Sequence, residues 1–350
     1  MRIVVLGLAI TSSWGNGHAT NYRALCGALR ERGHDLLFLE RDKPWYASNR
    51  DFDTPWVELY DSVDELVRWE ADVRTAELVL VGSYVPDGVE VAEWVLERAG
   101  GVVAFWDIDT PITAASLRRG ECEYLTPELV PRFDLYLSFT GGPLLDELGA
   151  ARPHPFWCMV DPRRYVPVER EPRWDLGYLG TYSDDRQPTL DELLLRPACR
   201  LPRRSFAVAG PMYPDSVTSE WPPNVDRRKN VAPGDHPAFY GSQRFTLNVT
   251  RAAMVGAGWS PSVRLFEAAA CAVPIVSDWW EGLDAFFEPG SEILIAHDAD
   301  DVERYLTEIG ERERRTIAAR ARARVLSEHT AARRAAELEL LLADVARAAA

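Results

Sequence analysis

Closely spaced cysteines, a dinucleotide-binding glycine fingerprint and a long apolar run are all missing from this chain of 350 residues. Its five cysteines are scattered and form no Cys-x-x-Cys pair, which argues against a metal site and fits a reducing compartment. The absence of G-x-G-x-x-G disfavours a dehydrogenase. The apolar start Met1–Ile10 is too short to span a bilayer, and no small-residue cleavage site follows it. We therefore expect a cytoplasmic protein with at most peripheral membrane contact.

The chain also has fewer basic than acidic residues. Lys and Arg number 39 against 54 Asp and Glu, giving a formal net charge of −15. This balance argues against a nucleic-acid partner, which favours a positive field. The arginine-rich stretch 311–324 also carries acids, so we expect a solvated helix that packs back across the first domain. With 47% hydrophobic residues, the chain has enough apolar side chains for the cores of two ordinary domains.

Strand and helix patterns alternate through the first 150 residues. The apolar runs Ile3–Leu6 and Asp35–Glu40 enclose a helical pattern from about Thr20 to Arg32. Such a βαβ unit implies parallel strands with a right-handed crossover, and ligand loops at their carboxyl ends. Further elements are predicted at Leu78–Gly82, Val89–Arg98, Val102–Trp106 and Leu135–Phe139.

Five prolines between Arg152 and Arg173 predict an interdomain connection. A second α/β pattern follows, with strands expected at Leu176–Gly180, Ser205–Val208, Asn230–Ala232 and Phe245–Val249. We predict an α/β protein with a Rossmann-like domain over residues 1–165 and a second one over 170–330. Residues 331–350 are expected to form a helix that packs on the N-terminal domain.

The most informative stretch is 260–278, which reads as a helix followed by a buried strand. Ser260 is a predicted N-cap and Pro261 the first helical residue. Arg264 and Glu267, three residues apart, then share one exposed face. A cation and a carboxylate near a helix N-terminus suit an anion that carries hydroxyls, such as a sugar nucleotide. A surface ion pair on an ordinary helix is the alternative.

Three segments resemble the CgeB-like (spore-maturation-type) glycosyltransferases of the GT-B superfamily. They are Gly177–Arg186, Thr246–Arg251 and Ser260–Cys271. The resemblance covers mainly Trp174 to about Thr330. It implies two Rossmann-like domains facing a central cleft, and a C-terminal helix that crosses back. It also implies sugar transfer from a nucleoside-diphosphate sugar held by the second domain.

Glu267 matches the second glutamate of the paired-glutamate motif of retaining GT-B enzymes, where it binds the ribose hydroxyls. The first glutamate would fall at Trp259, so the donor sugar and the stereochemistry stay open.

Arginine is the residue expected to hold a diphosphate, because its planar fork matches two phosphate oxygens. Arg186, Arg251 and Arg264 are the candidates, and a surface salt bridge is the alternative for each. The remaining donor-binding candidates come from the turn after the first strand of the second domain, from a base-reading loop and from the motif helix. They are Gly180, Thr181, His236, Ser260, Ser262 and Glu267.

The first domain supplies the catalytic candidates His18, Asp107 and Asp109. His18 would orient or deprotonate an acceptor, or simply neighbour a helix N-cap. The two aspartates follow a predicted strand and would act as a base or bind acceptor hydroxyls, or cap the turn that follows. We also expect the loop before the first helix to let donor phosphates or an acceptor approach the backbone closely. Its candidate residues are Gly15, Asn16 and Gly17.

We therefore predict a glycosyltransferase that needs neither metal nor cofactor beyond its nucleoside-diphosphate sugar, with an acceptor that the sequence leaves open. One alternative is a sugar-nucleotide 2-epimerase, which would convert the donor without an acceptor. Another is a non-catalytic glycan- or partner-binding assembly protein, a reading favoured by the missing first glutamate.

Overall fold

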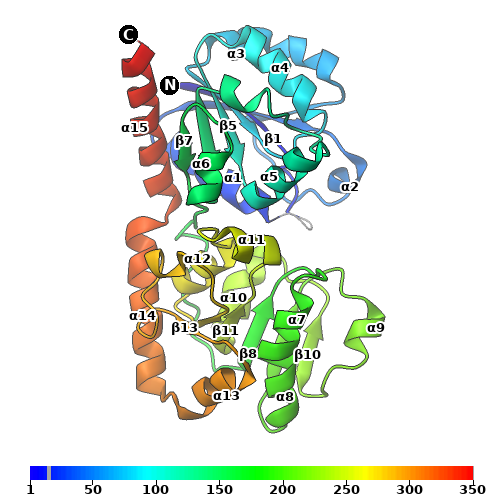
Figure 1. Cartoon of the computed structure of the whole chain (residues 1–350), viewed down its shortest axis with the longest axis vertical. Helices are drawn as coiled ribbons and strands as arrows, with labels where there is room; N and C mark the ends of the chain where they lie inside the picture. Colours follow the sequence, from blue (N-terminus) through cyan, green and yellow to red (C-terminus); the bar gives the residue numbers. More distant parts are fainter. Residues whose placement is uncertain (14–16, 350) are drawn as a thin grey trace. The chain divides into compact units, whose positions relative to one another are not determined.

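The structure is a computed structural model that describes residues 1–13 and 17–349. The chain forms two compact units (Figure 1). Unit 1 contains Met1–Met159 and Ala331–Ala350, and unit 2 contains Val160–Thr330. Each unit has one parallel sheet with flanking helices, so the predicted α/β class with two Rossmann-like domains is confirmed.

The sheet of unit 1 has seven parallel strands in the order β3-β2-β1-β4-β5-β6-β7. Its central strands β1 and β4 are apolar and buried apart from the half-buried Arg2 at the start of β1, as expected for a parallel sheet covered on both faces. The order reverses between β1 and β4, so the loops after these two strands open at the switch point, where ligands bind in such sheets. The strands are β1 (Arg2–Gly7), β2 (Asp35–Arg41), β3 (Val57–Tyr60), β4 (Leu78–Gly82), β5 (Val102–Asp107), β6 (Leu135–Ser138) and β7 (Pro153–Pro155).

Helices of unit 1 come from both ends of the chain. The longest of them, α1 and α15, pack against each other. Glu339 of α15 accepts hydrogen bonds from Arg32 Nε and His34 Nε2, each over 2.7 Å. The helices are α1 (His18–Glu31), α2 (Pro44–Ala47), η1 (Val63–Trp69), α3 (Glu70–Thr75), α4 (Gly88–Arg98), α5 (Thr110–Arg119), η2 (Val130–Arg132), α6 (Pro143–Glu147) and α15 (Ala331–Ala349).

The sheet of unit 2 has six parallel strands in the order β10-β9-β8-β11-β12-β13, with its switch point between β8 and β11. The strands are β8 (Trp174–Leu179), β9 (Phe206–Ala209), β10 (Val225–Arg228), β11 (Gln243–Asn248), β12 (Ile275–Ser277) and β13 (Leu294–Ile295). The helices are α7 (Gln187–Leu190), η3 (Asp191–Leu195), α8 (Arg196–Arg200), α9 (Asp215–Thr218), η4 (Pro233–Asp235), α10 (His236–Gly241), α11 (Ala252–Ala257), α12 (Val263–Ala270), η5 (Leu283–Ala285), α13 (Ala299–Glu308) and α14 (Glu311–Glu328).

One predicted strand was misplaced, and one edge strand was not predicted. The strand expected at Asn230–Ala232 is instead β10, five residues earlier, where four half-buried residues pair with β9. The start of the proline-rich connection is an edge strand, β7, which pairs with β6. Both are edge strands, where charged residues and prolines are tolerated and no apolar run is required.

The motif helix also begins later than predicted. Ser262, in an extended conformation, occupies the N-cap position of α12, while Ser260 and Pro261 lie in the preceding loop. The hydroxyl of Ser262 donates to Asn248 Oδ1 over 2.8 Å, which ties this loop to the end of β11. Likewise α14, which contains the arginine-rich stretch, packs on α12 within unit 2 and does not belong to unit 1.

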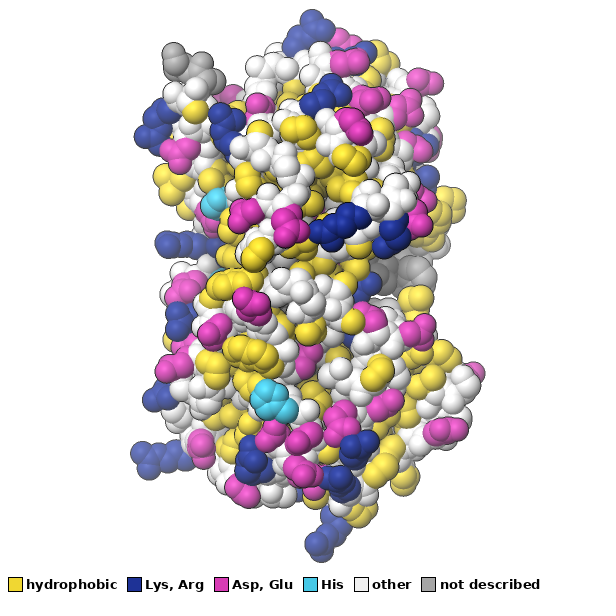
Figure 2. All heavy atoms as spheres, in the orientation of Figure 1, with side chains coloured by type: hydrophobic (Ala, Val, Ile, Leu, Met, Phe, Trp, Pro, Cys, Tyr) yellow, Lys and Arg dark blue, Asp and Glu magenta, His cyan; other side chains and the backbone are white. Residues whose placement is uncertain are grey.

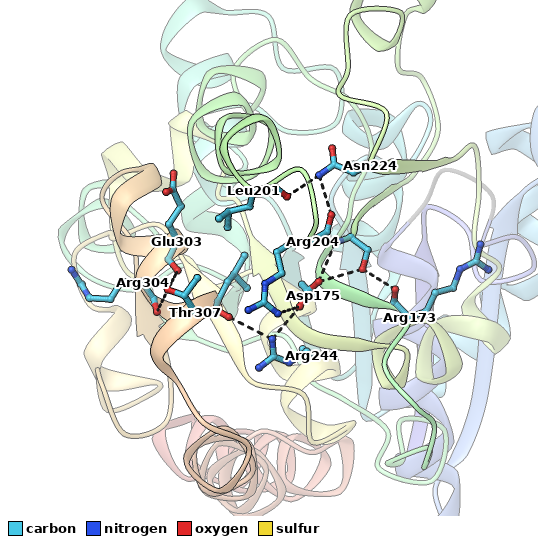
Figure 3. Close-up of polar contacts among 11 residues, drawn as sticks. Arg173, Asp175, Leu201, Arg204, Asn224, Arg244, Glu303, Arg304 and Thr307 are labelled. Atoms are coloured by element: carbon cyan, nitrogen blue, oxygen red, sulfur yellow. Dashed lines mark hydrogen bonds and ion pairs between the residues drawn. The ribbon is translucent and has the colours of Figure 1, made fainter.

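A polar cluster joins the amino ends of β8 and β11 to the loop before β9 (Figure 3). Asp175 accepts hydrogen bonds from Arg204 and Arg244 and from the backbone N–H of Ser205, each over 3.0 Å. Burial favours the neutral form of this carboxyl group, but these donors hold the pKa of Asp175 below its usual value. Both arginines of the cluster therefore have a carboxylate partner.

Charges of both signs are interspersed over the face of the molecule seen in Figure 2. This agrees with the composition, in which acidic residues outnumber basic ones. Within the described residues, no helix is both long and apolar enough to cross a membrane.

Candidate functional site

Arg264 lies at the switch point of the unit 2 sheet. From the first turn of α12 it donates through Nε to the carbonyl of Leu179, at the end of β8. Its Nη1 donates to Asn248 Oδ1 over 2.9 Å, at the end of β11. The guanidinium also lies over the ring of Tyr178, 4.8 Å from its centroid. Arg264 forms no direct ion pair with any described residue, and its charge opposes the effect of burial, which raises the pKa of Asp278.

The loop after β8 requires glycine at position 180. A Cβ atom there would lie 2.4 Å from the Tyr178 hydroxyl and 2.8 Å from Arg264 Nη2. The loop after β9 packs closely against the loop after β8, because a Cβ on Gly210 would lie 2.0 Å from the Gly180 carbonyl. The Tyr178 hydroxyl is buried beside this loop without a hydrogen-bond partner in the described part of the chain. Backbone, guanidinium and hydroxyl groups therefore converge on Gly180.

The other two candidate arginines differ in their neighbours. Arg186, which ends the turn that starts at Thr181, donates through Nε to Ser183 Oγ over 2.9 Å and forms no ion pair among the described residues. Arg251 lies with Nε 3.8 Å from Asp185 Oδ2, so part of its charge is compensated. Among the described residues, Arg186 and Arg264 are therefore the two candidates without a direct ion pair.

Glu267 lies on the buried side of α12, with 4% of its surface exposed, so the prediction of an exposed face was wrong for this residue. The Tyr240 hydroxyl donates to Glu267 Oε2 over 3.3 Å, and His236 Nδ1 lies 3.7 Å from the same oxygen. Burial, and then the Glu267 carboxylate, raise the pKa of Tyr165 and Tyr240 well above the usual value. Both phenols therefore remain protonated donors.

Three further predicted residues flank this site. Thr181 is half-buried in the turn after Gly180, Ser260 is buried in the loop before α12, and Ser262 is half-buried at the N-cap. His236 starts α10 and approaches the carbonyl of Val231 with Nε2 at 3.3 Å. The donor-binding candidates thus gather around the carboxyl ends of β8 and β11, where Arg251 follows β11 beside Asp185.

In unit 1, two catalytic candidates lie on either side of Tyr84, a residue that the sequence did not predict. The ring of His18, at the start of α1, stacks on Tyr84 with centroids 5.9 Å apart. The Tyr84 hydroxyl donates to Asp109 Oδ2 over 3.0 Å. Tyr84 follows β4 in a left-handed conformation, with φ of 63°, which costs backbone strain. Its place just after a strand at the switch point is the signal that identifies it.

Asp107 has a different environment from Asp109. It is fully buried and accepts hydrogen bonds from Tyr136 over 2.7 Å and from Thr113 over 2.8 Å. Burial raises its pKa to about 6, although these hydrogen bonds act to lower it. A carboxylate enclosed in this way holds β5, β6 and α5 together, and it leaves Asp109 as the aspartate closer to the surface.

Gly15 and Asn16, predicted to approach a ligand, lie outside the described residues, whereas Gly17 is exposed immediately before α1. Over the part of the chain that is described, no group of three or more His, Cys, Asp or Glu side chains is arranged to hold a metal ion.

Comparison with known proteins identifies the fold. Residues 186–339 match the family model "Glycosyl transferase-like". Among solved structures, the chain is similar to sucrose-phosphate synthase from Thermosynechococcus elongatus, at 13% identity and a TM-score of 0.73 over 99% of this chain and 100% of that one. It is also similar to HepE from Anabaena in complex with UDP-glucose, at 12% identity and a TM-score of 0.69 over 98% and 99% of the two chains.

A third similar structure is an alpha-glucosyltransferase in complex with UDP-glucose and DNA containing an abasic site. It is 12% identical with a TM-score of 0.72, over 97% of this chain and 98% of that one. No curated protein sequence matches the chain. The chain therefore shares its fold, with two Rossmann-like domains, with these solved structures, and residues 186–339 match a glycosyl transferase-like family model.

Proposed function

We propose that this protein is a glycosyltransferase that moves a sugar from a nucleoside-diphosphate sugar to an acceptor hydroxyl. The observation that carries the proposal is the combination of Arg186 and Arg264, which form no direct ion pair with a described residue, with the buried carboxylate of Glu267, around the carboxyl ends of β8 and β11. In this proposal residues 170–330 form the donor domain. Residues 1–165, with the helix of residues 331–350, form the acceptor domain.

The chemistry follows from these groups. When the bond between sugar and phosphate breaks, negative charge grows on the diphosphate, and fixed guanidinium groups stabilise that charge without reorganising. Glu267 would accept a hydrogen bond from a ribose hydroxyl, since an ionised carboxylate only accepts. His236 and the loop before α10 would contact the base, and Gly180 and Thr181 the phosphates. The proposed transfer uses no metal ion.

In unit 1 we assign the acceptor hydroxyl to His18 and Asp109, with Tyr84 between them. His18 has the chemistry to take a proton near neutral pH. Tyr84 would fix the orientation of both neighbours. Asp107 stays outside this role because it is enclosed by its own hydrogen bonds.

Within the class we place the chain among CgeB-like proteins, and we propose transfer with retention of configuration. Support comes from the segments Gly177–Arg186 and Ser260–Cys271 and from Glu267 at the second position of the paired-glutamate motif. The anomer of the sugar released by slow donor hydrolysis, read by NMR, tests the stereochemistry. An inverted first product would contradict it.

The first experiment is a calorimetric titration with UDP, GDP and dTDP, followed by UDP-release assays with UDP-glucose. UDP is the natural starting point because HepE and the alpha-glucosyltransferase were solved with UDP-glucose. We expect saturable binding of at least one nucleotide, weakened by Glu267→Ala. If the folded protein binds none of the three, the proposal is wrong.

One observation favours a second candidate, a protein that binds a nucleotide sugar without turning it over. Trp259 occupies the position of the first motif glutamate, in a left-handed conformation with φ of 48°. Its backbone N–H donates to the Glu281 carbonyl over 2.6 Å, and its ring fills the space that a Cβ on Gly282 would occupy. Nucleotide binding with no UDP release and no new nucleotide sugar, across a panel of acceptors, would support this candidate. Conversion of the donor without acceptor would indicate an epimerase.

A further inference from the structure

Arg227 is a cation that the predicted site did not include. It lies on the edge strand β10, and its guanidinium reaches over the end of the neighbouring strand β9. Nη2 donates to the Gly210 carbonyl over 2.6 Å and Nη1 to the Val208 carbonyl over 3.5 Å. These bonds fix the charge at the same edge of the sheet as Arg264, whose guanidinium is fixed by carbonyls at the ends of β8 and β11.

No carboxylate compensates Arg227 within the described residues, and burial lowers its pKa. The next residue, Arg228, does have a partner, since its Nη2 lies 3.3 Å from Asp226 Oδ2. At the opposite end of the sheet, Arg204 and Arg244 share Asp175 (Figure 3). A partly desolvated cation without a counter-charge is unfavourable by itself, so an anion bound beside it would be stabilised.

Tyr213 connects Arg227 with the two arginines of the proposed site. The Arg227 guanidinium lies 4.6 Å from the centroid of the Tyr213 ring. Burial raises the pKa of Tyr213, while the charges of Arg186, Arg264 and Arg227 all oppose that shift, so one hydroxyl lies in the field of three guanidinium groups. The backbone also connects Arg227 with Arg264. Gly210, whose carbonyl accepts from Arg227, lies against the Gly180 carbonyl, and Gly180 lies beside Arg264.

We propose that Arg227 is a third cationic binding residue for the diphosphate of the donor, with the Tyr213 hydroxyl as an additional donor beside it. This inference rests on the proposed function. Its consequence is selectivity for charge: three guanidinium groups match the several negative charges of a nucleoside diphosphate better than those of a monophosphate or a nucleoside.

The test compares the binding of UDP, UMP and inorganic pyrophosphate to the full chain by calorimetry. Arg227→Gln should weaken UDP and pyrophosphate binding about ten-fold or more, as loss of a charged hydrogen-bonding partner does. UMP binding should change less, so the ratio of UDP to UMP affinity falls. Tyr213→Phe should give a smaller loss in the same direction, which keeps the test open if Arg227→Gln does not fold.

Arg228→Gln is the matched control, since it removes the same charge one residue away on the same strand. Its UDP affinity should equal that of the wild type. The inference is overturned if Arg227→Gln binds UDP like the wild type, or if the Arg227 and Arg228 variants lose affinity equally. If the wild type binds neither UDP nor pyrophosphate, the proposed function itself fails, and that result is visible before any variant is made.

Discussion

Tyr240 and Glu267 face each other in the interior of unit 2, with the phenol oxygen 3.3 Å from a carboxylate oxygen. His236 approaches the same oxygen, so the carboxylate is held from α10 as well as by its own helix. A carboxylate fixed in this way is oriented before a ligand arrives, which reduces the entropy that binding must overcome.

The first prediction concerns recognition of ribose. The wild type should bind UDP about ten-fold more tightly than 2′-deoxy-UDP, because a buried acceptor left without its donor is costly. Glu267→Gln should reduce that preference, measured by calorimetry with both nucleotides. Glu303→Gln, which changes a surface partner of Arg200 in the same unit, serves as the control and should keep the preference. An unchanged preference in Glu267→Gln would show that the carboxylate does not meet the ribose.

The second prediction concerns Gly180. In Gly180→Ala the new methyl group would meet the Tyr178 hydroxyl and Arg264 Nη2, and the flexible guanidinium would move away. UDP affinity should therefore fall by about ten-fold, the effect of one displaced charged contact. Gly310→Ala is the control, since a Cβ atom there meets nothing within 4 Å. Equal UDP affinity in the two variants would remove Gly180 from the phosphate site.

The third prediction concerns Asp107 and pH. Its pKa is raised from 3.8 to about 6 in the folded protein, so the folded state binds more protons than the unfolded state between these values. The free energy of unfolding therefore falls as pH rises through this window, and the penalty is complete above the folded pKa. Compared with Asp107→Asn, the wild type should lose about 2 kcal/mol of stability between about pH 4.5 and 7.

Urea unfolding of both proteins at each pH measures that difference, and groups common to both proteins cancel. A difference that stays constant with pH, or that grows in favour of the wild type, would contradict a raised pKa at Asp107.

The fourth prediction concerns the cluster in Figure 3. Asp175→Asn removes the carboxylate that Arg204 and Arg244 share, and should destabilise unit 2 by about 3 kcal/mol. Since the pKa of Asp175 is lowered in the folded state, its contribution is present above the unfolded pKa and disappears as pH falls below it. Asp300→Asn, which breaks an exposed pair with Arg200, should cost less than about 1 kcal/mol. Urea unfolding near neutral pH compares the two variants, and equal losses would contradict this ranking.

The sequence predicted the central strands well because each is an apolar run with clear ends, as in Leu78–Gly82, which matches β4 residue for residue. Edge strands were harder to place. Val225–Arg228 has two arginines and an aspartate in four residues, and its position is set by pairing with β9, which no local pattern encodes.

The start of α12 was misplaced for a similar reason. Ser260 followed by Pro261 has the pattern of a helix start, but the bond from Ser262 to Asn248 and the turn at Trp259 place the helix later. The donor-site candidates came from motifs and gather in space, whereas Arg227 and Tyr84 depend on contacts between distant segments. The local sequence gives the type of each side chain, whereas contacts between distant segments decide which charged side chains have a partner.

Helix α15 follows the whole of unit 2 in the sequence and yet completes unit 1, where Ala335, Leu338 and Leu342 are buried. During translation every strand of both sheets leaves the ribosome before this helix does. Unit 2 can therefore finish folding while the surface of α1 that meets α15 is still exposed on the nascent chain. The N-terminal part of unit 1 is therefore made first, but the unit can be completed only after unit 2 has been made.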